Sequence, residues 1–103
     1  MAGMTAATHP PLPSRFWADL STRDSTGLRA SGHARQTVAV LPVAAIEQHG
    51  PHLPLSVDAT LLQGVMDAAL PLLPAALPVL FLPPQVVGLS PEHARFAGTL
   101  TLK

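Results

Sequence analysis

The sequence predicts an α/β fold: a parallel sheet built on a βαβ unit with flanking helices. Two apolar runs, residues 37–43 (TVAVLPV) and 79–82 (VLFL), have the composition of strands buried on both faces. Between them, residues 59–70 place apolar side chains at the spacing of an amphipathic helix. Strand, helix and strand in this order predict two parallel strands joined by a right-handed crossover.

The start of the chain is expected to be loosely attached. Residues 1–12 are small and proline-containing, which predicts a flexible arm and leaves residues 13–103 as the domain. Ser14 is the expected N-cap of a short amphipathic helix. The aromatic side chains of that helix, Phe16 and Trp17, are expected to pack on the sheet.

The remaining elements follow from turn and capping signals. The polar, glycine-containing residues 21–35 are expected to form a connecting loop. Asp58 stands where the N-cap of the central helix belongs, and Pro71 limits its C-terminal end. Residues 99–102 are expected to form a short last strand.

Composition excludes several classes of function. The chain has 103 residues, no cysteine and a net charge of zero, so disulfides, thiol nucleophiles and cysteine-based zinc sites are excluded. The few Lys and Arg residues form no basic run, and no nucleic-acid partner is expected. The N-terminus lacks the pattern of a signal peptide, and prolines interrupt the longest apolar stretch. These features predict a cytoplasmic protein without a membrane partner.

One loop concentrates side chains that bind metal ions. EQHGPHLPLSVD, residues 47–58, follows the first predicted strand, at the sheet edge where α/β proteins bind ligands. Glu47, His49 and Asp58 offer carboxylate oxygen and imidazole nitrogen, which divalent cations accept together. Two carboxylates close together also favour a cation that neutralises them. The alternative is that both carboxylates are solvated and that Asp58 only caps the helix.

Two stretches resemble the creatininase (creatinine amidohydrolase) family. LPVAAIEQHGPHLPLSVD is similar to the family signature that runs from an apolar strand to an Asp. FLPPQVVGLSPEHARFAGTLTL is similar to a second family segment, with Ala97 where the family more often has proline. The likeness covers roughly residues 37–102 and implies an incomplete creatininase-like three-layer α/β domain.

The resemblance implies a site with two divalent ions, zinc and/or manganese. In it, Glu47 would bind one ion, His49 the other, and Asp58 would bridge both. A metal-bridging water or hydroxide would then attack a carbonyl-type carbon and open a cyclic amide or hydrolyse a related C–N bond. His52 is assigned a supporting role beside the ligands. Ser90 and His93 are expected to line the substrate pocket, with a capped turn and an exposed imidazole as the alternative, and His9 and His33 to be incidental.

The family's remaining ligands, a His and a Glu on a later segment, have no counterpart here. The resemblance therefore implies an N-terminal portion of a hydrolase that acts on a small-molecule substrate and is homo-oligomeric at full length. This portion is expected to be inactive alone and to bind the metal ions weakly or only in part. One alternative is a non-catalytic remnant that acts as a metal-binding or subunit-interface module. Another is a small structural α/β domain.

Overall fold

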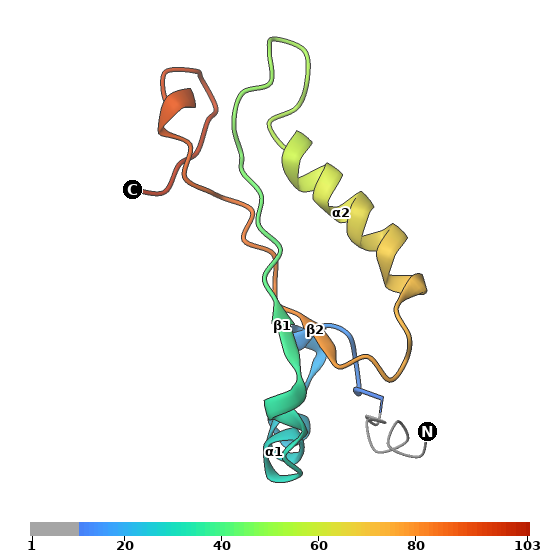
Figure 1. The fold of residues 1–103 in the computed structure, drawn as a ribbon. Coiled ribbons are helices and arrows are strands. Elements are labelled where there is room, and N and C mark those ends of the chain that lie inside the picture. Colours follow the sequence, from blue (N-terminus) through green and yellow to red (C-terminus); the bar gives the residue numbers. More distant parts are fainter. Residues whose placement is uncertain (1–10) are drawn as a thin grey trace. The chain divides into compact units, whose positions relative to one another are not determined.

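The computed structural model describes residues 11–103, so His9 and most of the predicted arm lie outside the described residues. The chain forms two compact units (Figure 1). Within the described residues, the first combines residues 11–40 with Leu73–Pro83, and the second combines Leu41–Leu72 with Pro84–Lys103. We refer to them as unit 1 and unit 2.

Unit 1 contains the predicted parallel strand pair. Strand β1, Val38–Val40, pairs in parallel with β2, Val79–Phe81, with Val38 opposite Val79 (Figure 1). This pairing confirms the α/β class, because a parallel pair needs a long crossover between its strands. Leu80, at the centre of β2, is 1% exposed and is the main core residue of this unit.

The aromatic helix at the start of the domain is only a single turn. The 3-10 helix η2 spans Trp17–Asp19, and the Ser14 hydroxyl accepts a hydrogen bond from the Phe16 amide instead of capping an α-helix. Phe16 does pack on the sheet, since it bridges to Phe81 and the two ring centroids are 6.3 Å apart. Trp17 remains 47% exposed.

The predicted loop over residues 21–35 is wrong, because most of it is helical. Helix α1, Thr22–Ala30, begins with a capping box in which Ser21 and Asp24 each bond the other's backbone amide. Gly32, at φ +82°, breaks the chain direction before the 3-10 helix η3, His33–Gln36. The Ser-Thr-Arg-Asp string was a capping signal that outweighed the polar composition.

The expectation that the first strand is buried on both faces is also wrong. Val38 is 56% exposed and the side chains of β1 are at best half-buried. The sheet has two strands in the described part of the chain, so it offers too little surface to cover both faces of β1. The apolar run predicted the strand correctly but not its surroundings.

Unit 2 is built around helix α2, Val57–Ala69, which is followed by the 3-10 turn η4, Leu70–Leu72, containing Pro71. Asp58 is not the N-cap: Ser56 holds that position, without a side-chain capping bond, and Asp58 lies in the first helical turn. The helix begins earlier than predicted because the Ser56 carbonyl accepts the first helical bond from Thr60. No helix in the described residues is long and apolar enough to cross a membrane.

Extended segments complete unit 2. The Ala44 amide donates to the Gln85 carbonyl, and the Gln85 amide donates to Pro42. Ala44 and Gly88 lie so close that a Cβ on Gly88 would be 2.7 Å from the Ala44 carbonyl oxygen, which explains the glycine. The last predicted strand, residues 99–102, is reduced to one antiparallel bridge at Leu100.

Candidate metal centre

The segment that carries Glu47 is held from both sides within unit 2. The Ile46 carbonyl accepts a 2.8 Å hydrogen bond from the Leu100 amide, and the Gln48 amide donates to the Thr99 hydroxyl at 3.1 Å. Gly50, at φ +79°, then turns the chain in a conformation that favours glycine. Glu47 therefore extends from a backbone that is anchored at the residues before and after it.

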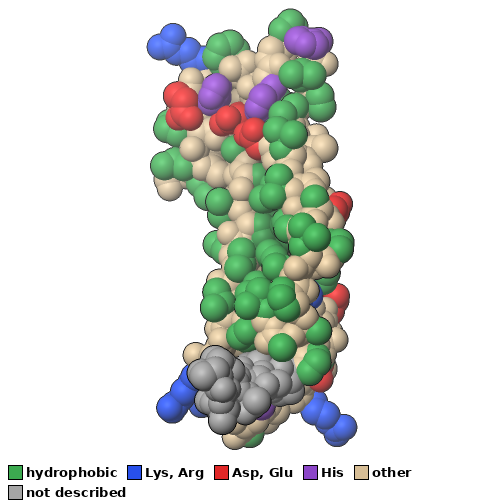
Figure 2. All heavy atoms as spheres, turned by 45° about the vertical axis from the view of Figure 1, so that its right-hand side comes forward, with side chains coloured by type: hydrophobic (Ala, Val, Ile, Leu, Met, Phe, Trp, Pro, Cys, Tyr) green, Lys and Arg blue, Asp and Glu red, His purple; other side chains and the backbone are tan. Residues whose placement is uncertain are grey.

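Glu47, His49 and Asp58 meet in unit 2. Each offers one ligand-type atom, and these atoms lie within 4.8 Å of one another. All three residues are half-buried, and His49 Nε2 lies 3.2 Å from Asp58 Oδ1. Figure 2 shows carboxylate and imidazole side chains gathered on one surface. The loop and the first turn of α2 thus bring together the side chains that the sequence nominated as ligands.

The hydrogen bonds of His49 determine which way its ring presents its lone pair. Its Nδ1 lies 2.8 Å from the Glu47 carbonyl oxygen, which can only accept, so Nδ1 carries a hydrogen. In the neutral ring Nε2 is then a lone-pair acceptor, and it faces the Asp58 carboxylate, a second acceptor. Two acceptors at this distance need a proton or a cation between them.

The surroundings of His49 favour a proton at this position. The hydrogen bond to the Glu47 carbonyl raises the pKa of His49 above its usual value, and the Asp58 carboxylate adds to this effect. Burial opposes both effects. A cation that binds at Nε2 would compete with that proton.

A second group shares Glu47. His93, on the 3-10 turn η5, Pro91–His93, places its Nε2 3.7 Å from Glu47 Oε1 and 3.9 Å from Glu92 Oε1. Glu92 is exposed, and sequence reasoning missed it although it stands inside the quoted Ser-Pro-Glu-His string. The His93 Nδ1 lies 2.9 Å from Gln48 Nε2.

The other predicted site residues, His52 and Ser90, belong to neither of these groups. His52 is exposed. Ser90 is fully buried, its Oγ has no hydrogen-bond partner within the described chain, and its amide donates to Thr101 Oγ1 at 2.7 Å. A hydroxyl that is buried and unpaired is costly. It caps no turn with its side chain.

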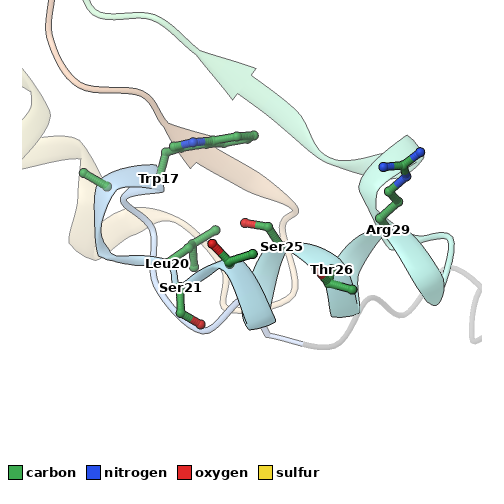
Figure 3. A pocket seen from close by; sticks show the side chains of 8 residues that line it. Trp17, Leu20, Ser21, Ser25, Thr26 and Arg29 are labelled. Atoms are coloured by element: carbon green, nitrogen blue, oxygen red, sulfur yellow. The ribbon is translucent and has the colours of Figure 1, made fainter.

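Two cavities differ in what they could bind. In unit 1, a depression of about 400 Å³ is lined by hydroxyl side chains of α1, Trp17 and Arg29, without carboxylate or imidazole among its lining residues (Figure 3). In unit 2, a depression of about 330 Å³ lies beside Gln48 and Gly50, and is completed by Pro51, Phe96 and Ala97. This second cavity adjoins the ligand-bearing loop.

Comparison with known proteins matches residues 22–103 to the family model described as "Creatininase: Creatinine amidohydrolase". The mycofactocin precursor peptide peptidase of Mycolicibacterium smegmatis is 35% identical over 72 residues, which are 68% of this chain and 29% of the relative. The peptidase of the same name from Mycobacterium tuberculosis strain H37Rv is 41% identical over 69 residues, covering 61% of this chain and 28% of the relative.

Solved structures of creatininase mutants are similar in fold. One superposes with a TM-score of 0.63 at 28% identity, over 87% of this chain and 34% of the other. A second, described as Zn-Zn type, gives the same TM-score, identity and coverage. The chain therefore spans about a third of the length of these proteins, and less than a third of the curated relatives.

Proposed function

Because the chain belongs to the creatininase family, we propose that it supplies metal ligands to a hydrolase that cleaves a C–N bond in a cyclic amide or related small molecule. The observation that carries this proposal is the arrangement of His49. Its Nδ1 is committed to the Glu47 carbonyl, so its Nε2 lone pair and the Asp58 carboxylate face each other with Glu47 beside them.

The donor set suits zinc or manganese. Imidazole nitrogen with carboxylate oxygen is a combination that both ions accept, and a chain without cysteine offers no thiolate ligand. Glu47 and His49 would each hold an ion, and Asp58 has two oxygens with which to serve both. The Zn-Zn description of a structural neighbour supports zinc as the first ion to test.

The ions would supply Lewis acidity, which lowers the pKa of water and polarises a carbonyl. The residues of this chain contribute position. Asp58 lies in the first turn of α2, where the partial positive charge of the helix favours a carboxylate. The hydrogen bond from His49 to the backbone fixes its ring, as partners of metal-binding imidazoles commonly do.

The substrate class has two candidates. The family description favours a cyclic amide such as creatinine. The curated relatives carry the name of a precursor peptide peptidase, and at 35% and 41% identity they are more similar to this chain than the creatininase structure at 28%. The depression beside Gln48 and Gly50 adjoins the loop that carries the proposed ligands. A supporting role for His52 and a substrate-binding role for Ser90 and His93 remain predictions. Because Ser90 is buried, a substrate would have to insert a group into the protein to contact its hydroxyl.

The runner-up is a non-catalytic metal-binding or subunit-interface module. It shares the proposed ligands, so metal binding alone does not separate it from the hydrolase. Turnover of cyclic amides and of short peptides by a full-length parent protein, with and without Asp58→Asn, makes the distinction. A hydrolase loses activity with the carboxylate, whereas a module shows no turnover in either form.

Metal binding by the chain is tested by calorimetric titration with Zn²⁺ and, separately, with Mn²⁺. We expect binding by the wild-type chain and strong loss in Glu47→Gln and Asp58→Asn. The matched control is Asp67→Asn, which removes an exposed carboxylate of the same helix that accepts a hydrogen bond from Gln63. The proposal fails if the wild-type chain binds neither ion, or if Asp58→Asn binds as well as Asp67→Asn.

A further inference from the structure

The two groups that share Glu47 have the same composition, two carboxylates and one imidazole, but differ in their hydrogen bonds. The difference begins at Gln48, whose backbone lies between Glu47 and His49. Its side chain makes two contacts of fixed direction. These contacts determine what His93 presents to Glu47.

The first contact orients the Gln48 amide. The Gly50 backbone N–H, which can only donate, lies 3.0 Å from Gln48 Oε1. The oxygen of the amide therefore points to Gly50, and the NH₂ group is left to face the His93 ring. Exchanging the two ends of the amide would place NH₂ against the Gly50 N–H, donor against donor.

The second contact assigns the His93 tautomer. Gln48 Nε2 lies 2.9 Å from His93 Nδ1, and an NH₂ group donates, so Nδ1 is the acceptor. A neutral imidazole with an accepting Nδ1 carries its hydrogen on Nε2. That Nε2–H lies between the Glu47 and Glu92 carboxylates, at 3.7 and 3.9 Å.

We propose that the chain Gly50 N–H, Gln48 amide and His93 makes His93 a hydrogen-bond donor that positions the Glu47 carboxylate, and not a metal ligand. This inference rests on the proposed function, because it assigns Glu47 to a cation. At 3.7 Å the His93–Glu47 contact is longer than a hydrogen bond. The contact closes when Glu47 turns one oxygen to the cation and the other to His93.

The hydrogen bonds of His93 also distinguish a metal ligand from a residue that positions a ligand, which residue type alone does not. A cation on His93 Nε2 would require the hydrogen to move to Nδ1, where it would meet the Gln48 NH₂ group. Relieving that clash by turning the amide would cost the bond to Gly50. His93 is therefore a positioning residue for Glu47, and Glu92 is not drawn into a second cation site by it.

The tautomer is tested first, without metal, by ¹⁵N–¹H correlation spectra of the imidazoles at a pH where His93 is neutral. We expect the His93 hydrogen on Nε2 in the wild-type chain. In Gln48→Glu both side-chain oxygens accept, so we expect a hydrogen on His93 Nδ1. The control Gln63→Glu adds the same charge on α2 and leaves His93 unchanged. A wild-type hydrogen on Nδ1, or an unchanged ring in Gln48→Glu, overturns the proposal.

The role toward the cation is tested by adding Zn²⁺ to the same samples. We expect the His49 Nε2 signal to shift while His93 keeps its Nε2–H. His93→Leu should weaken Zn²⁺ binding by about 10–100-fold, as removal of partners around metal ligands does, and His93→Gln, which keeps an N–H donor, should restore part of it. Loss of the His93 Nε2–H on adding Zn²⁺, or wild-type affinity in His93→Leu, overturns the proposal. No change at His49 instead refutes the proposed function and leaves the metal-free tautomer result standing.

Discussion

His49 and His93 each form a group with Glu47, and the comparison shows how hydrogen bonding divides two similar imidazoles into different roles. In His49, Nδ1 donates to a backbone carbonyl, and the lone pair of Nε2 is directed to Asp58. In His93, Nδ1 accepts from Gln48, and Nε2 directs a hydrogen to Glu47. In the roles proposed above, a cation binds the first ring directly, and the second ring supports a ligand. In each ring Nε2 faces the carboxylates, and the hydrogen-bond partner of Nδ1 decides whether Nε2 carries a lone pair or a hydrogen.

The largest difference is expected when each ring is replaced by the same residue. His49→Gln should reduce Zn²⁺ affinity by more than the roughly 100-fold that marks the upper range for partners around metal ligands. His93→Gln should stay below that range. Calorimetric titration of both variants measures the difference. Equal losses would erase the distinction between the two imidazoles.

The two acidic neighbours of His93 sharpen the comparison. Glu47 belongs to both groups, so Glu47→Gln should strongly weaken Zn²⁺ binding. The Glu92 side chain is 64% exposed, and Glu92→Gln should change the binding free energy by at most about 1 kcal/mol, the range of exposed ion pairs. Titration of both variants under the same buffer conditions provides the test. A loss in Glu92→Gln as large as in Glu47→Gln would indicate a second cation site.

Gly50 follows His49 in the chain and donates its amide to Gln48, so it belongs to the hydrogen-bonded chain that ends at His93. At φ +79° a side chain is strained, so Gly50→Ala should lower the free energy of unfolding by about 1–2 kcal/mol. The strain should also loosen the Gly50 bond to Gln48 and mix the His93 tautomers, while His49 keeps its hydrogen on Nδ1. Chemical denaturation and imidazole spectra of the variant measure the two effects. The control is Gly27→Ala in α1, where a Cβ would meet nothing within 4 Å.

Asp24 in unit 1 shows the smallest effect and a contrasting use of a carboxylate. It accepts the Ser21 amide, and this hydrogen bond lowers the pKa of Asp24 below its usual value. The stabilisation is present above the unfolded-state pKa and is lost as the pH falls through the lower folded-state pKa. We therefore expect the start of α1 to fray in acid. Backbone chemical shifts recorded from neutral pH to about pH 2 measure this fraying. Asp24→Asn should reduce this pH dependence.

Local sequence signals predicted part of the fold and missed part of it. The apolar runs predicted two strands and their parallel pairing, and the apolar periodicity predicted α2, because these patterns are set by neighbours along the chain. Helix α1 was missed because the polar composition of residues 21–35 was weighed above its capping string. The prediction that β1 is buried on both faces was wrong, because burial depends on how many strands and helices surround a strand. The residues of the strand itself do not encode that number.

For the site, the sequence by itself determined the family and three candidate ligands, while Glu92 and Gln48 were not predicted. Glu47, His49 and Asp58 are close enough along one loop and helix start for their type and order to be informative. The tertiary structure decided what each one faces: Asp58 turns to His49 instead of capping α2, and Ser90 is buried. It also brought His93 to Gln48 across 45 residues of sequence. Tautomers depend on hydrogen-bond partners, and partners that are distant along the chain meet only in the folded protein.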